Sequence, residues 1–166
     1  MPRDRLYALI DAARDGGGPE SPSVDPDALR EVVAALDPDE LSGFVLAFDD
    51  ELIRLNRWSV WGAGYVANGG MGDDDFHYFR CWLIGKGRSA VDAVLEDPDA
   101  LADHLDAAGL ENEGLEYVGL DLLEERGLPD PRDDADRAYA DDEPSGQPFD
   151  EGAVEAAYPR TAAASG

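Results

Sequence analysis

Cysteine and lysine each occur only once in the sequence, as Cys81 and Lys86. A single cysteine excludes an internal disulfide, and Cys81 lies in an apolar run, where a small buried hydrophobic residue is favoured over a reactive thiol. Long apolar runs are absent. Runs such as residues 81–84 are far shorter than the roughly 18 residues that a membrane span needs. The N-terminus at residues 1–4 lacks the apolar run of a signal peptide. We therefore expect a cytoplasmic protein that enters no membrane.

The sequence motifs of familiar enzymes are also missing. The chain contains no Gly-x-Ser-x-Gly, no Walker loop and no dinucleotide-binding fingerprint. The glycine-rich run at residues 69–72 is too short to cradle a phosphate by itself. We therefore expect no catalytic residues and no cofactor.

Positive charge is scarce. The chain has 38 acidic and 13 basic residues, which gives a net charge of −25. Such a charge repels nucleic acid and anionic membranes. Because the acids are spread along the whole chain, adaptation of the surface to solubility or to salt is the favoured explanation. The alternative is an acidic surface that mimics nucleic acid or neutralises a basic partner protein.

Apolar residues recur at steps of three and four along most of the chain, as they do in amphipathic helices. Aspartate-proline pairs at residues 25–26 and 37–38 are typical of helix starts, and glycine runs at residues 16–18 and 69–70 of helix ends. We predict an all-α protein, a compact single-domain multi-helix bundle without a sheet. The expected helices cover residues 3–15, 27–36, 38–56, 58–67, 74–84, 88–96 and 113–126, with a short helical turn after Pro98.

The chain divides by composition near residue 128. Residues 1–128 carry the helical pattern, and residues 129–166 form an acidic linker and tail. Residues 131–145 hold few large apolar side chains, so we expect this part to be mobile or loosely packed. Residues 146–160 carry Phe149, Val154 and Tyr158, through which the tail is expected to dock again.

Two stretches, WSVWGAGYVANGG at residues 58–70 and DDDFHYFRCWLIGKGR at residues 73–88, carry a resemblance to a known family. They resemble the signature of a bacterial family of domains of unknown function, DUF4240. The similarity extends from the first helix to about residue 126, and residues 146–151 and 158–160 are similar to the usual end of the family. The chain departs from the pattern at Met71-Gly72, where the family has a Cys-Ser pair. The resemblance implies a compact helical domain of unassigned activity and supplies no catalytic residues.

Polar and ionisable side chains that could bind a ligand are concentrated between Asn68 and Arg80. Asp73 and His77 are four residues apart, a spacing that could place a carboxylate and an imidazole on one helix face for a divalent metal. Two ligands are too few, and the second histidine, His104, lies on a polar short helix, so helix capping by the aspartates is favoured and no metal site is expected. The candidate ligand-binding residues are Trp58, Trp61, Tyr65, Asn68, Asp73, Asp74, His77 and Arg80. For the aromatic members, core packing is favoured over a ligand pocket.

Arg80 lies in a helix that is otherwise apolar on nearly every side. A buried guanidinium needs a carboxylate partner or a path to solvent. The favoured interpretation is an ion pair with Asp49 or Asp50, or with the turn at residues 73–75. The alternative is a pocket in which Arg80 binds an anionic ligand.

Two functional hypotheses follow. The first is a non-catalytic binding or regulatory module with an acidic surface, whose partner is a basic protein. The second is a small-molecule or metal-dependent enzyme centred on residues 68–80. Convergence of Asp73, Asp74, His77 and Arg80 on one open cleft would favour the enzyme.

Overall fold

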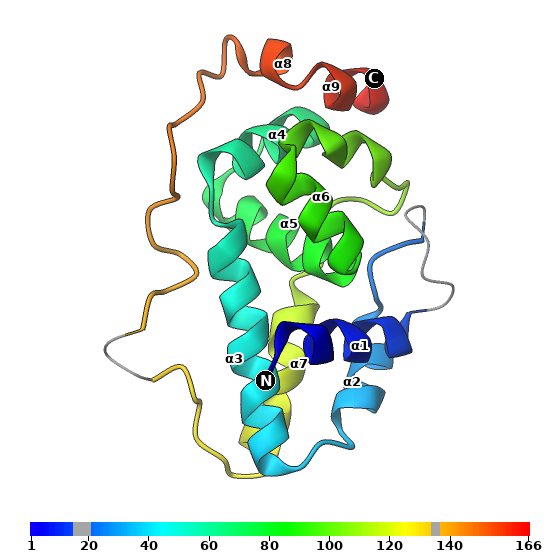
Figure 1. The fold of residues 1–166 in the computed structure, drawn as a ribbon, viewed down its shortest axis with the longest axis vertical. Coiled ribbons are helices and arrows are strands. Elements are labelled where there is room, and N and C mark those ends of the chain that lie inside the picture. The colour runs from blue at the N-terminus through cyan, green and yellow to red at the C-terminus, as the bar shows by residue number, and fades with distance from the viewer. Residues whose placement is uncertain (15–20, 134–136) are drawn as a thin grey trace.

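The computed structural model describes residues 1–14, 21–133 and 137–166, and within these ranges the chain is helical without a β-strand (Figure 1). The predicted all-α class is therefore confirmed. The expected end of the first helix at residues 15–18, and residues 134–136 of the expected linker, lie outside the described residues. The helices are α1 (Arg3–Ala13), α2 (Pro26–Val33), α3 (Pro38–Leu55), α4 (Trp58–Asn68), α5 (Asp73–Gly85), α6 (Arg88–Glu96), η1 (Pro98–Asp103), α7 (Gly114–Glu125), α8 (Val154–Ala157) and α9 (Pro159–Ser165).

Aspartate caps start several of these helices, as the sequence predicts. The carboxylate of Asp25 accepts hydrogen bonds from the backbone amides of Asp27 and Ala28 at 2.9 and 3.1 Å, and that of Asp37 accepts from the amide of Glu40 at 2.9 Å. A proline at the first helical position follows each cap, where its missing N–H costs nothing. At the end of α4, Gly69 takes a φ of 68°, which reverses the chain toward α5.

Helix α5 lies at the centre of the molecule. It packs against α3, α6 and α7, while α1 and α2 cover α3 and α7 at one end and α4, η1 and α9 pack together at the other (Figure 1). Phe79, Trp82 and Leu83 of α5 are buried within the hydrophobic core. The prediction that this helix is central and buried is confirmed. Among the described residues, no helix is both long and apolar enough to cross a membrane.

Residues 137–153 run along the side of α3 and on to α8 at the far end of the molecule (Figure 1). Arg137 forms ion pairs with Asp49 and Asp50 of α3. Further along, Asn56 donates a hydrogen bond to the carbonyl of Asp142 at 2.6 Å, and Ser145 donates to the carbonyl of Asn56 at 3.0 Å. Residues 137–145 are thus attached to α3 through side-chain and backbone contacts.

Helices α8 and α9, which the sequence analysis did not predict, lie beyond this segment. Each has fewer than eight residues, so its apolar pattern is too brief to stand out in the sequence. Helix α9 packs against η1 and α4. Its Thr161 is buried, and the Thr161 backbone amide donates to the carboxylate of Asp99 at 2.9 Å.

At Gly62 of α4 the tail packs closely against the bundle. A Cβ at this position would lie 2.8 Å from the hydroxyl of Tyr158 and 3.2 Å from the ring of Phe149. Gly64 of the same helix faces the side chains of Met71 and Phe79 in the same way.

Replacing Trp82 by alanine should lower the free energy of unfolding by about 3–5 kcal/mol, as deletions of large buried aromatic side chains do. Trp82 is 2% exposed and lies against Phe79 with ring centroids 5.7 Å apart. Chemical denaturation followed by circular dichroism measures the change. An unfolding midpoint equal to that of the wild type would show that this face of α5 does not pack in the core.

Replacing Gly62 by valine should displace Phe149 and Tyr158 from α4, because the added atoms overlap both rings. We expect a loss of about 1–3 kcal/mol, typical of overpacking, together with faster proteolysis within residues 146–160. Ser59→Val is the matched control, since it places the same β-branched residue at an exposed position of the same helix. Equal cleavage rates in the two variants would contradict the docking of the tail on Gly62.

Candidate functional site

A pocket of about 520 Å³ opens beside α5, between the start of α7 and the tail segment at residues 141–144. Five of the candidate residues chosen from the sequence line it, namely Trp61, Asp73, Asp74, His77 and Arg80. The other residues of its wall are Asn56, Phe76, Tyr78, Glu116, Tyr117, Asp141, Asp142, Glu143 and Pro144. Residues 73–80 therefore supply one side of the pocket, and Asn56, Trp61, the start of α7 and the tail segment at residues 141–144 supply the rest.

The remaining candidates, Trp58, Tyr65 and Asn68, do not line this pocket. The rings of Trp58 and Tyr65 contact Phe149 of the tail, with centroids 6.2 and 5.3 Å away. The amide of Asn68 donates to the carbonyl of Gly70 at 3.0 Å and closes the turn after α4. These side chains therefore contact the tail and the turn after α4 and lie outside the wall of the pocket.

Trp61 links the aromatic cluster to the pocket. Its ring stacks on Trp58 at 5.1 Å on one side and on Phe76 at 4.7 Å on the other. Its indole N–H donates to the carbonyl of Met71 at 3.1 Å. This stacking and the hydrogen bond fix the ring that forms one wall of the pocket.

Arg80 is 2% exposed and has hydrogen-bond partners at all three guanidinium nitrogens. Nη1 donates to the carbonyl of Leu52 at 3.1 Å and to the carbonyl of Ala140 at 2.6 Å, and Nη2 donates to Asp141 at 3.2 Å. Nε donates to the carbonyl of Phe76 at 3.4 Å, and the guanidinium lies over the Phe76 ring. Burial lowers the pKa of Arg80, and the charge of Asp141 opposes that shift.

The predicted partners of Arg80 were wrong. Asp49 and Asp50 pair with Arg137, and the aspartates at residues 73–75 make no ion pair with Arg80. Arg80 instead reaches the last turn of α3, where the amide of Asn56 donates to the carbonyl of Ile53 and the carbonyl of Leu52 accepts from Arg80. Its carboxylate partner, Asp141, comes from the tail.

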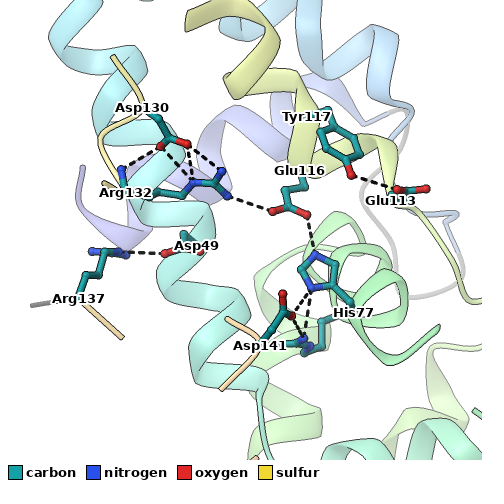
Figure 2. A network of polar contacts seen from close by, with 10 residues as sticks. Asp49, His77, Glu113, Glu116, Tyr117, Asp130, Arg132, Arg137 and Asp141 are labelled. Carbon is teal, nitrogen blue, oxygen red and sulfur yellow. Dashed lines mark hydrogen bonds and ion pairs between the residues drawn. The ribbon is translucent and has the colours of Figure 1, made fainter. Parts of the chain in front are cut away.

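His77 lies between two carboxylates (Figure 2). Its Nε2 is 2.6 Å from Oε2 of Glu116, and its Nδ1 is 2.8 Å from Oδ1 of Asp141. The pKa of His77 is raised to about 11 by its interactions with Cys81 and Glu116, against the effect of burial, with a further contribution from Asp141.

The contacts of His77 continue into a network of charged side chains, called the His77 network here. Glu116 also accepts a hydrogen bond from Arg132 at 3.1 Å, and Arg132 pairs with Asp130 (Figure 2). Burial would raise the pKa of Glu116, but the hydrogen bond with His77 and the charges of His77 and Arg132 lower it. The network joins α5, α7 and the tail.

Sequence reasoning missed Glu116, Arg132 and Asp141. They lie 39, 55 and 64 residues from His77 along the chain, and no local motif marks them. His104, expected on a polar short helix, lies at the end of η1 and is 7% exposed.

Among the described residues, one group has ligand types and spacing suited to a metal ion. Nitrogen, sulfur and oxygen atoms of His77, Cys81 and Glu116 all lie within 4.8 Å of one another. Asp73, considered from the sequence as a partner of His77, is not a member of this group. Cys81 is buried as expected, and burial raises the pKa of its thiol.

The fold and the pocket define an all-α domain in which the central helix and an acidic tail form one polar site. Residues 1–125 match the model of the family described as "Protein of unknown function (DUF4240)", and the chain belongs to this family. The matched region includes His77, Arg80 and Glu116, whereas Asp141 lies beyond it. No curated protein and no solved structure matches the chain.

Replacing Arg80 by methionine should cost about 2–5 kcal/mol of stability, because the buried carbonyls of Leu52 and Ala140 lose their donor and each such loss costs about 1–3 kcal/mol. Asp141→Asn should cost less than about 1 kcal/mol, since the Asp141 side chain is 74% exposed and asparagine keeps an acceptor. Urea denaturation of both variants measures the difference. Equal losses would show that Arg80 serves mainly as the ion-pair partner of Asp141.

Proposed function

We propose that this protein is a non-catalytic binding module whose pocket accepts a guanidinium or ammonium group from a basic segment of a partner protein. The observation that carries the proposal is the charge of the pocket. Its wall includes the carboxylates of Asp73, Asp74, Glu116, Asp141, Asp142 and Glu143, whereas its cationic side chains are Arg80 and His77.

The cationic side chains of the pocket are already engaged within the protein. Arg80 donates to carbonyls and to Asp141, and both ring nitrogens of His77 face carboxylates. In contrast, Asp73, Asp74 and Glu143 form no ion pair within the described residues and are exposed. A cation that enters the pocket therefore meets carboxylates whose charge is not neutralised locally, and the net charge of −25 draws it in from solution.

The aromatic walls suit the same ligand. Trp61, Phe76, Tyr78 and Tyr117 line the pocket, and the hydroxyl of Tyr117 donates to Glu113 at 3.1 Å. A guanidinium or ammonium group over an aromatic face gains about 0.5–1 kcal/mol at exposed sites. Tyr117 is 45% exposed, so part of this wall is available to a partner that covers the pocket mouth.

An anionic ligand is disfavoured by the same contacts. The hypothesis that Arg80 binds an anion requires free donors on its guanidinium. Each of its nitrogens already has an acceptor, and Asp141 occupies the side that faces the pocket. The surrounding carboxylates would repel a further anion.

An enzyme at the same pocket is the second candidate, since Asp73, Asp74, His77 and Arg80 do converge there. The engagement of His77 and Arg80 by acceptors of the protein favours binding over chemistry. Mass spectrometry of a cationic peptide after prolonged incubation separates the two functions. An unchanged mass supports the binding module, and a modified peptide supports the enzyme.

Isothermal titration with an acetylated, amidated tri-arginine peptide tests the proposal. We expect binding that weakens with added salt and that is lost for the tri-citrulline peptide, which has the same shape without the charge. In Asp73→Asn/Asp74→Asn the affinity should fall roughly two- to thirtyfold, because exposed ion pairs contribute about 0.2–1 kcal/mol each.

A matched control is Glu31→Gln/Asp121→Asn, which removes the same net charge at exposed positions outside the pocket. The proposal predicts nearly unchanged affinity for this control. Equal losses in the two double variants would mean that the peptide responds only to the overall charge and would contradict the pocket as its site.

A further inference from the structure

His77 and Cys81 lie one turn apart on α5, and the side chain of Glu116 on α7 faces them. We propose that these three side chains form a site for a zinc-like transition metal ion, with His77 Nε2, Cys81 Sγ and Glu116 Oε2 as ligands. Zinc binds such atoms at about 2.0–2.3 Å in tetrahedral geometry. Ligand atoms that already lie within 4.8 Å of one another need only small side-chain adjustments to reach it.

The hydrogen-bond partners of His77 indicate which of its ring nitrogens would bind the metal ion. Histidine ligands almost always donate their second ring N–H to a carboxylate, a carbonyl or water, and this contact fixes the ring. Nδ1 of His77 lies 2.8 Å from Asp141 and Nε2 lies 2.6 Å from Glu116. With a metal ion on Nε2, Nδ1–H would be donated to Asp141, which would complete a carboxylate–histidine–metal triad.

Glu116 is held in a similar way. Its Oε1 accepts a hydrogen bond from Arg132 at 3.1 Å, and Arg132 is in turn held by Asp130 (Figure 2). These contacts leave Oε2 directed toward His77. Two of the three ligands are therefore already oriented by neighbouring residues of the His77 network.

The donor set indicates the class of metal. Nitrogen, thiolate and carboxylate donors together suit Zn²⁺ and Co²⁺, whereas Mg²⁺ and Ca²⁺ prefer oxygen donors alone. Binding displaces protons from Cys81 and His77, so the affinity for metal should rise with pH. His77 and Glu116 also line the pocket, which leaves a fourth coordination position for water or a small ligand from that side.

Cobalt titration of the full chain, after treatment with a chelator, tests the site. Excess Mg²⁺ in the buffer occupies the surface carboxylates. We expect one Co²⁺ per chain and a thiolate-to-cobalt charge-transfer band, which zinc abolishes when it displaces the cobalt. Because Cys81 is the only cysteine, the band can arise only from this residue, and Cys81→Ser must abolish it.

The roles of Asp141, His77 and Glu116 are tested by the cobalt affinity of variants at these positions. Asp141→Asn should weaken metal binding about 10–100-fold, as loss of a residue that orients a ligand does. His77→Gln and Glu116→Gln should weaken it by at least as much, with circular dichroism confirming that each variant is folded. Absence of the charge-transfer band in the wild type, or wild-type affinity in His77→Gln, would overturn the proposal.

Asp73→Asn/Asp74→Asn is the control, because it changes the wall of the pocket and keeps all three ligands. This variant should bind cobalt as tightly as the wild type. A large loss of affinity would assign the cobalt to the acidic surface and overturn the metal site. Running the peptide titration in the presence of a chelator tests the cation-binding proposal separately from the metal site.

Discussion

The buried guanidinium of Arg80 is the interaction on which the arrangement of this protein depends. A charged group that is 2% exposed must be fully hydrogen-bonded, because desolvation of an unpaired charge costs several kcal/mol. The acceptors come from α3 through Leu52 and from the tail through Ala140 and Asp141. One side chain of the central helix thus joins the end of α3 to the tail and, with His77, positions the carboxylate that closes the pocket.

This arrangement explains why a strongly acidic chain can hold its acidic tail against an acidic bundle. Arg80, Arg132 and Arg137 are placed where carboxylates of different segments meet, and each pairs with at least one of them. These three arginines therefore lie at the junctions between elements. The carboxylates that remain at the mouth of the pocket are then left to attract a cation from outside the chain.

Local features of the fold were predictable from the sequence, and contacts between distant segments were not. The caps at Asp25 and Asp37 and the apolar run of α5 depend on residues within a turn or two, so residue spacing reveals them. Residues 68–80 stood out for the same reason, and four candidates from this stretch, Asp73, Asp74, His77 and Arg80, line the pocket. The partners of Arg80 and His77 depend on how α3, α7 and the tail pack around α5, and no single sequence encodes that packing locally. Asp141 is 61 residues from Arg80, and Asp49 was an equally reasonable partner by charge alone.

The most direct test of the central claim, that the pocket beside α5 receives a cationic group, is nuclear magnetic resonance mapping of the arginine peptide on the labelled protein. The account predicts that the largest shifts on titration fall on the indole N–H of Trp61 and on the backbone amides of residues 73–78, 116–117 and 141–144. These residues line the pocket or lie beside those that do. Shifts spread over the exposed acids of α2, η1 and α8, with these signals unmoved, would contradict it.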